Sequence, residues 1–211
     1  MTAHAKLSPS GSKRWFACPG SLVLEAPIPN KSNTYSDDGT AMHDIAARCL
    51  TMHYQATKYI GEDVPVHHEG EPERFVEFTD EMAELVQGYV DTVRVIGIGN
   101  EVHIEKRVDF SEFVQLPDSF GTADAIVVDD RAGELVLIDL KTGHTPVVVE
   151  ENSQLMLYAL GVLAILATGD QVGALQALEA YRQLSLQALD EEPSPELEAR
   201  LQAMRDDLRL S

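Results

Sequence analysis

Two acidic residues and a lysine, placed at or inside apolar segments, are the residues of this sequence best suited to chemistry. Asp139 and Lys141 stand two positions apart in Leu137–Gly143, which reads Leu-Ile-Asp-Leu-Lys-Thr-Gly. Asp124 stands inside a second apolar run, Thr122–Val128. A charge in such a segment is costly unless it is paired or bound to a metal. Two carboxylates and a lysine suit a hard divalent cation such as Mg²⁺, which lowers the pKa of a bound water for attack on a phosphodiester.

The segments that carry these residues are predicted to be neighbouring strands. Thr122–Val128 and Glu134–Leu140 have the length and apolar composition of strands and are joined by a tight turn rich in Asp and Gly. The period of two along a strand puts Asp139 and Lys141 on one face. The turn brings Asp124 beside Asp139. The alternative is an ion pair between Asp139 and Lys141 that does no more than close a strand.

The remaining elements follow from the spacing of apolar residues and from turn signals. We expect helices over Lys13–Phe16, from Gly39–Thr40 onward, over Thr79–Val95 and over Gln154–Thr168 with Gly169 ending it, and a strand over Glu101–Val108. Loops are expected over Ala26–Asp38 and residues 61–74, and two amphipathic helices over Gln171–Ala188 and Pro195–Leu208. This order predicts an α/β domain over residues 1–170, with a small mixed sheet flanked by helices, and a helical C-terminal appendage over residues 171–211.

Three polar side chains on the predicted helices add to the candidates. Gln154 and Tyr158 are four residues apart and therefore share one helical face. An amide and a phenol there suit a DNA phosphate or base, or support of the lysine, although a partly exposed helical face is the simpler interpretation. His43 follows Thr40 by three residues, in the first turn of its predicted helix, where packing or solvent exposure is the alternative to a ligand role.

Together these motifs resemble the PD-(D/E)XK nuclease superfamily, and within it the RecB-like branch. The sequence contains Gly-Thr-x-x-His at Gly39–His43, Gly-Thr-Ala-Asp at Gly121–Asp124, Asp-x-Lys-Thr-Gly at Asp139–Gly143 and Gln-x-x-x-Tyr at Gln154–Tyr158, in the order of that superfamily. The opening segment Ser8–Ser21, with Arg-Trp-x-x-Cys-Pro-Gly-Ser, looks like the phage-associated exonucleases of the branch. The resemblance covers roughly residues 7–168 and implies a restriction-endonuclease-like core.

The resemblance also implies a role for each motif residue. His43, Asp124 and Asp139 would ligate Mg²⁺ or Mn²⁺, together with the backbone carbonyl of Leu140. Asp124, Asp139 and Lys141 would form the catalytic set, in which Lys141 positions or activates the water. Glu105, on the preceding predicted strand, would stand behind these ligands. The residues that support the site or contact DNA would be Gln154, Tyr158, Ser12, Arg14 and Trp15, of which Trp15 has a core anchor as its simpler interpretation.

The sequence departs from the pattern of these relatives in two respects. Some of them bind an iron–sulfur cluster through four cysteines, whereas this chain has only Cys18 and Cys49, so we expect no cluster. The superfamily core also has further strands after the Gln-x-x-x-Tyr helix, where this sequence continues in helical patterns. The sheet would then be short, completed by another chain, or truncated.

Charge and composition restrict the function classes. The 211 residues carry a net charge of −19, and residues 61–170 account for most of it, with six Lys/Arg against twenty-three Asp/Glu. This acidity argues against non-specific DNA coating and leaves room for a carboxylate-rich metal site. No apolar run reaches the ~20 residues of a membrane span, and no secretory signal is recognised at the N-terminus. We therefore expect a cytoplasmic protein with no membrane partner.

The combined prediction is a metal-dependent DNA exonuclease of phage or prophage recombination or DNA processing. Its partners would be DNA and a phage recombination protein, and an apolar stripe in the C-terminal helices could serve a homo-oligomer or pack on its own domain. Two alternatives remain open. One is a catalytically inactive nuclease fold that binds DNA or acts as a scaffold, and the other is an acidic protein that mimics DNA.

Overall fold

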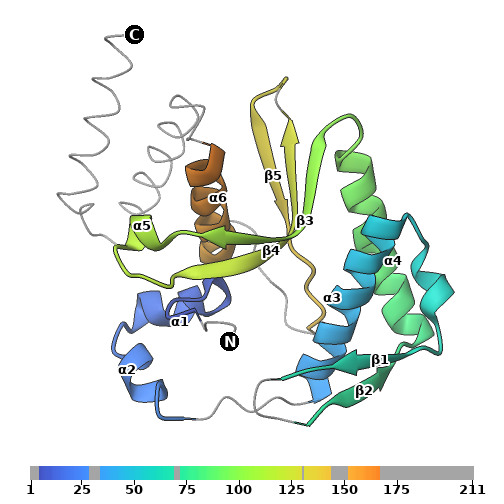
Figure 1. Cartoon of the computed structure of the whole chain (residues 1–211), viewed down its shortest axis with the longest axis horizontal. Coiled ribbons are helices and arrows are strands. Elements are labelled where there is room, and N and C mark those ends of the chain that lie inside the picture. The colour runs from blue at the N-terminus through green and yellow to red at the C-terminus, as the bar shows by residue number, and fades with distance from the viewer. Residues whose placement is uncertain (1–4, 29–33, 69–71, 130, 144–151, 167–211) are drawn as a thin grey trace. The chain divides into compact units, whose positions relative to one another are not determined.

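The chain forms a mixed α/β structure, as predicted. In this computed structural model the structure describes residues 5–28, 34–68, 72–129, 131–143 and 152–166 (Figure 1). The helices are α1 (Ser12–Ala17), α2 (Ser21–Glu25), α3 (Thr34–Met52), α4 (Asp80–Ile96), α5 (Ser111–Val114) and α6 (Ser153–Leu166), with 3₁₀ turns at Pro9–Gly11 and Ala56–Tyr59. The strands are β1 (Asp63–Val66), β2 (Arg74–Glu77), β3 (Glu101–Asp109), β4 (Phe120–Asp129) and β5 (Glu134–Ile138). In the part of the chain that the structure describes, no helix combines the length and apolar character needed to cross a membrane.

The chain divides into two compact units that interleave in sequence. One comprises Val23–Lys106 and Ala123–Val147, and we call it the central unit. The other comprises Met1–Leu22, Arg107–Thr122 and Val148–Ser211, and we call it the terminal unit. The sequence does not predict this interleaving, because the predicted domain limits follow the order of the elements along the chain.

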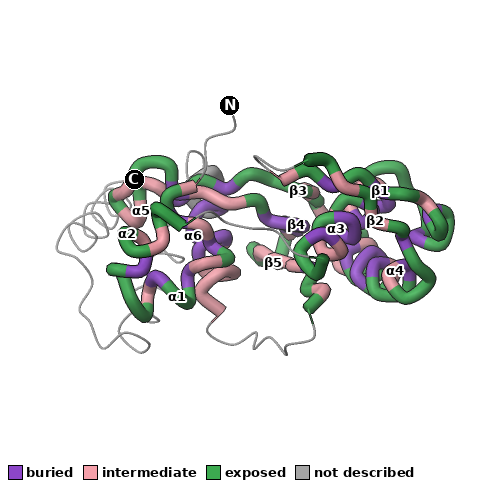
Figure 2. The backbone as a smooth tube through the Cα atoms, turned by 90° about the horizontal axis from the view of Figure 1, so that it is seen from below, coloured by how far each residue is buried: buried purple, intermediate pink, exposed green. Residues whose placement is uncertain are grey.

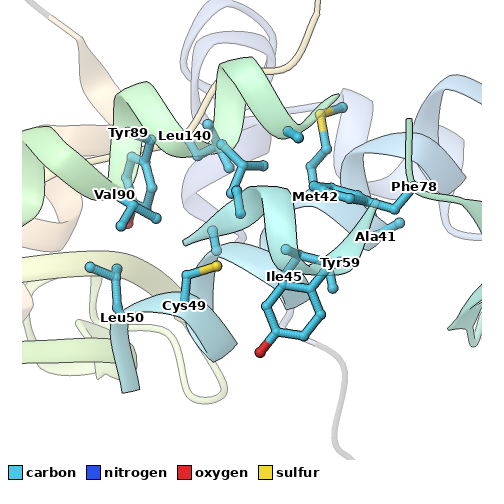
Figure 3. Packing of buried hydrophobic residues seen from close by; sticks show 14 of the residues in the cluster. Ala41, Met42, Ile45, Cys49, Leu50, Tyr59, Phe78, Tyr89, Val90 and Leu140 are labelled. Carbon is cyan, nitrogen blue, oxygen red and sulfur yellow. The ribbon is translucent and has the colours of Figure 1, made fainter. Parts of the chain in front are cut away.

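The core of the central unit lies where α3 and α4 pack together. Buried positions recur along both helices (Figure 2), and their side chains form one apolar cluster with residues of β1, β4 and the segment after β5 (Figure 3). Thr79 caps α4, because its hydroxyl accepts a 3.3 Å hydrogen bond from the backbone nitrogen of Met82. Asp80 and Glu81 in the first turn add favourable charge at the helix N-terminus. The predicted helix over Thr79–Val95 is confirmed.

The helix that carries His43 begins earlier than predicted. α3 starts at Thr34, so the expected loop up to Asp38 is wrong in its last part, and Gly39 lies inside the helix. Gly39 does not begin the helix as the sequence predicts, but lies at a packing contact. A Cβ atom at this position would lie 3.1 Å from the hydroxyl oxygen of Thr142, in the segment that follows β5. The glycine therefore allows the Asp-x-Lys-Thr-Gly segment to approach α3 closely.

Two contacts of the Asp37 side chain stabilise the first turn of α3. Its buried carboxylate lies 2.7 Å from Nε2 of His68 and 2.6 Å from a guanidinium nitrogen of Arg74.

The predicted loop over residues 61–74 is wrong at both ends, where β1 and β2 pair antiparallel from Asp63↔Glu77 to Val66↔Arg74. β1 has only four residues with alternating burial, too few for periodicity to separate a strand from a loop.

β3, β4 and β5 form the second sheet in that order. β4 and β5 pair antiparallel from Ala125↔Ile138 to Asp129↔Glu134, so the two predicted strands and their connection are confirmed. β5 ends at Ile138, two residues earlier than expected. The predicted strand over Glu101–Val108 corresponds to β3, but strict alternation fails at Glu105, whose φ is 48°. A left-handed residue inside a strand marks a local distortion of the pleat.

The terminal unit has a core of its own. Leu7, Trp15 and Phe110 pack against Leu157 and Leu160 of α6. Asn152 caps α6, since its side-chain oxygen accepts from the backbone nitrogens of the second and third residues of the helix at 3.1 and 3.3 Å. The predicted helix is confirmed as far as Leu166. Gly169 and the two C-terminal helices lie outside the described residues.

Candidate metal centre

Asp124 occupies the centre of the candidate site. Its side chain is nearly buried on β4, and Oδ2 accepts a 2.6 Å hydrogen bond from the backbone nitrogen of Leu140. Oδ1 lies 3.3 Å from Nδ1 of His43. The carboxylate is therefore oriented by two elements that are distant in sequence, the segment after β5 and helix α3.

His43 reaches Asp124 from well inside α3, with the neighbouring apolar positions of the helix facing the core. Burial alone would lower the pKa of this imidazole. The hydrogen bond to Asp124, followed by the negative charges of Asp124, Glu105 and Asp139, outweighs burial and raises the pKa. A histidine must be neutral to ligate a metal, so cation binding at this position would compete with protonation.

Glu105 completes a group of three side chains that could hold a metal ion. One ligand atom each from His43, Glu105 and Asp124 lie within 4.8 Å of one another. The positive φ of Glu105 accompanies this placement on β3. Loss of hydration, followed by the negative charge of Asp124, raises the pKa of the Glu105 carboxyl to about 7. Loss of hydration is the larger cause, and repulsion by the negative charge of Asp124 adds to it.

Asp139 and Lys141 adjoin this group on the neighbouring chain segment. Asp124 directly precedes and Asp139 directly follows the last pair of the two strands, Ala125↔Ile138. Lys141 Nζ lies 2.6 Å from Oδ2 of Asp139. Burial raises the pKa of the Asp139 carboxyl, and the charge of Asp124 adds to this, while the hydrogen bond from Lys141 opposes it.

The donor set fits a divalent cation chemically. Carboxylate oxygens suit Mg²⁺ and Mn²⁺, and an imidazole nitrogen is a common ligand of transition metals. A cation among His43, Glu105 and Asp124 would also relieve the repulsion that raises the pKa of Glu105. For Leu140, the backbone nitrogen is the group that contacts Asp124, and the role of its carbonyl stays a prediction.

The other predicted site residues belong to the terminal unit. Ser12 is buried, and its hydroxyl lies 2.6 Å from that of Ser153. Trp15 is a core residue whose Nε1 donates a 3.0 Å hydrogen bond to the carbonyl of Ser8. Tyr158 is also buried, on α6. Of these five residues, Arg14 is exposed and Gln154 is half-buried.

Glu105 is the residue that sequence reasoning underestimates. The sequence places it on the strand that precedes Asp124, which is the correct element. Its position within the ligand group depends on the distortion of β3 at a positive φ. Periodicity assumes a regular pleat and does not reveal such a distortion.

The fold and these side chains define an α/β protein with a candidate metal centre on α3, β3 and β4. The chain belongs to a family described as "Protein of unknown function (DUF2800)", whose model matches residues 4–172. That match covers all the residues that the structure describes. A comparison with solved structures finds no match.

Proposed function

We propose that this protein is a metal-dependent deoxyribonuclease, which hydrolyses phosphodiester bonds of DNA. The observation that supports this most strongly is the convergence of His43, Glu105 and Asp124, with the Asp139–Lys141 pair on the neighbouring segment. The resemblance of the motif order to RecB-like nucleases supports the same reaction and favours attack from a DNA end. Phage or prophage DNA processing, with a recombination protein as partner, belongs to the same proposal.

The proposed chemistry assigns a task to each group. A bound Mg²⁺ or Mn²⁺ would supply charge stabilisation at the phosphate and lower the pKa of water. His43, Asp124 and Glu105 would hold that ion, and Asp139 would contribute from the opposite residue of the strand pair. Lys141 would orient the attacking water, since its ammonium already lies against Asp139. The water attacks the phosphorus in line, and the 3′ oxygen leaves.

The acidity of the chain is compatible with this proposal. The acids of the ligand group stand close enough for their charges to shift one another's pKa values. A divalent cation would neutralise part of this charge, which is a condition for a polyanion to approach. Activity is therefore expected only with the cation present.

The test is digestion of linear double-stranded and single-stranded DNA in the presence of Mg²⁺ or Mn²⁺. We expect the wild type to degrade DNA, and Asp124→Asn and Lys141→Ala to lose at least ~10²-fold in rate, as removal of one main electrostatic contributor does in other enzymes. Glu134→Gln, at the other end of β5, is the matched control and should retain the wild-type rate.

Equal background in all four proteins would refute the enzyme. A DNA-binding titration would then separate the two alternatives. Retained DNA binding would indicate an inactive scaffold, whereas no binding would leave the acidic DNA mimic.

A further inference from the structure

Tyr89 places a polar atom where the core would otherwise be apolar. It lies on α4 and is 8% exposed, within the cluster that also contains Ala125 and Leu140. Figure 3 labels Tyr89 and Leu140 of this cluster. These two residues are the direct chain neighbours of Asp124 and Asp139. Tyr89 thus belongs to the same buried cluster as the residues next to the two acids.

The hydroxyl of Tyr89 has no hydrogen-bond partner among the residues that the structure describes. Buried hydroxyls nearly always have a partner, because an unsatisfied one forfeits its hydration without compensation. A phenylalanine would fill the same space without this loss. Packing therefore accounts for the ring and leaves the hydroxyl unexplained.

The negative charges that act on the hydroxyl are those of the candidate metal centre. Burial, followed by the negative charges of Asp124, Glu105 and Asp139, raises the pKa of the Tyr89 phenol. The phenol therefore keeps its proton and remains a hydrogen-bond donor. Ionised carboxylates only accept hydrogen bonds, so they cannot donate one to an oxygen atom of a bound molecule. The Tyr89 hydroxyl can donate such a hydrogen bond.

We propose that Tyr89 is a positioning residue of the metal centre, whose hydroxyl donates a hydrogen bond to an oxygen atom that enters with the divalent cation. That oxygen belongs either to a water or to a phosphate group. The inference rests on the metal centre of the proposed function, but it does not require that DNA is cleaved.

Tyr89→Phe separates this role from a structural one. In the metal-free protein the substitution removes an unsatisfied hydroxyl, so the melting temperature should stay the same or rise. In the presence of the cation it removes a hydrogen bond, so the affinity for the cation should fall. A hydroxyl that only stabilises the fold would lower the melting temperature of the metal-free protein instead.

The experiment is a Mn²⁺ titration, followed by electron paramagnetic resonance, of the wild type, Tyr89→Phe and Tyr59→Phe. Tyr59 is the matched control, because it belongs to the same buried cluster but its ring stacks against Arg48. We expect Tyr89→Phe to bind Mn²⁺ about 5- to 10-fold more weakly, as loss of one hydrogen bond implies. Tyr59→Phe should bind like the wild type. A second series with inorganic phosphate distinguishes the source of the oxygen, since a loss seen only with phosphate assigns it to a phosphate group.

Affinity equal to the wild type in both series would overturn the inference, and so would a lower melting temperature of metal-free Tyr89→Phe. Wild-type protein that binds no Mn²⁺ would refute the metal centre and this role together. Wild-type protein that binds Mn²⁺ without cleaving DNA would refute only the nuclease.

Discussion

Asp124 and Leu140 are joined by a 2.6 Å hydrogen bond from the backbone nitrogen of Leu140 to the Asp124 carboxylate. Asparagine can preserve this bond through its amide oxygen, whereas alanine leaves a buried backbone nitrogen without a partner. We therefore expect Asp124→Ala to be less stable than Asp124→Asn by about 1–3 kcal/mol. Urea unfolding of the metal-free variants measures the difference. Both substitutions remove the same negative charge, so equal stabilities would show that the hydrogen bond contributes nothing.

The pKa of Glu105 predicts a pH dependence of stability. With a pKa of about 7 in the folded protein against about 4.3 in an unfolded chain, the folded state retains a proton between these pH values that the unfolded chain has released. This favours folding at low pH, and the contribution is lost as the pH rises to 7. The raised pKa of His43 also favours folding at low pH, and this contribution is lost at higher pH, as the imidazole of the folded protein loses its proton.

Glu105→Gln should remove the first of these contributions. As the pH is raised from 5 to 8, the melting temperature of the metal-free variant should rise relative to that of the wild type. Glu134→Gln, an exposed substitution on β5, should follow the wild type throughout. A Glu105→Gln curve parallel to the wild type would contradict the raised pKa of Glu105.

The backbone at Glu105 makes a separate prediction. Alanine at a φ of 48° keeps the steric cost of the left-handed region, which glycine avoids. Glu105→Gly should therefore be at least as stable as Glu105→Ala. At His103 on the same strand, where φ is not positive, glycine should be less stable than alanine by about 0.5–1 kcal/mol. Thermal unfolding of the four variants tests this, and the same order at both positions would count against the distortion of β3.

Two helical glycines test the packing. A Cβ at Gly161 of α6 would overlap with a methyl carbon of Val108 and would lie 3.0 Å from the carbonyl oxygen of Asp109. At Gly88 of α4 a Cβ would meet nothing within 4 Å. Gly161→Ala should therefore destabilise the protein by about 1–3 kcal/mol, while Gly88→Ala should stabilise it by up to about 1 kcal/mol. Chemical denaturation measures both, and a stable Gly161→Ala would show that α6 packs differently.

The sequence correctly predicts those helices in which the apolar stripe extends over several turns and a capping residue marks the N-terminus. α4 shows this, because its stripe spans more than four turns and Thr79 supplies the cap. The pairing of β4 with β5, which brings Asp124 and Asp139 to the same end of the two strands, follows from two apolar strands and a short turn. Local sequence carries enough information in these cases.

The rest depends on tertiary contacts that local sequence does not encode. α3 extends back to Thr34 while His68 and Arg74 hold Asp37 in its first turn. β1 is too short for its period to be recognised. Glu105 enters the ligand group at a left-handed backbone conformation, and Tyr89 reads as an ordinary member of an apolar stripe. The nuclease activity and the metal remain predictions.

The most direct test of the metal centre is a crystal structure of the protein with Mn²⁺, with anomalous data collected near the manganese absorption edge. The account predicts a peak in contact with Asp124 and with at least one of His43 and Glu105. A well-ordered site without such a peak at saturating Mn²⁺, or a peak bound by unrelated residues, would contradict it.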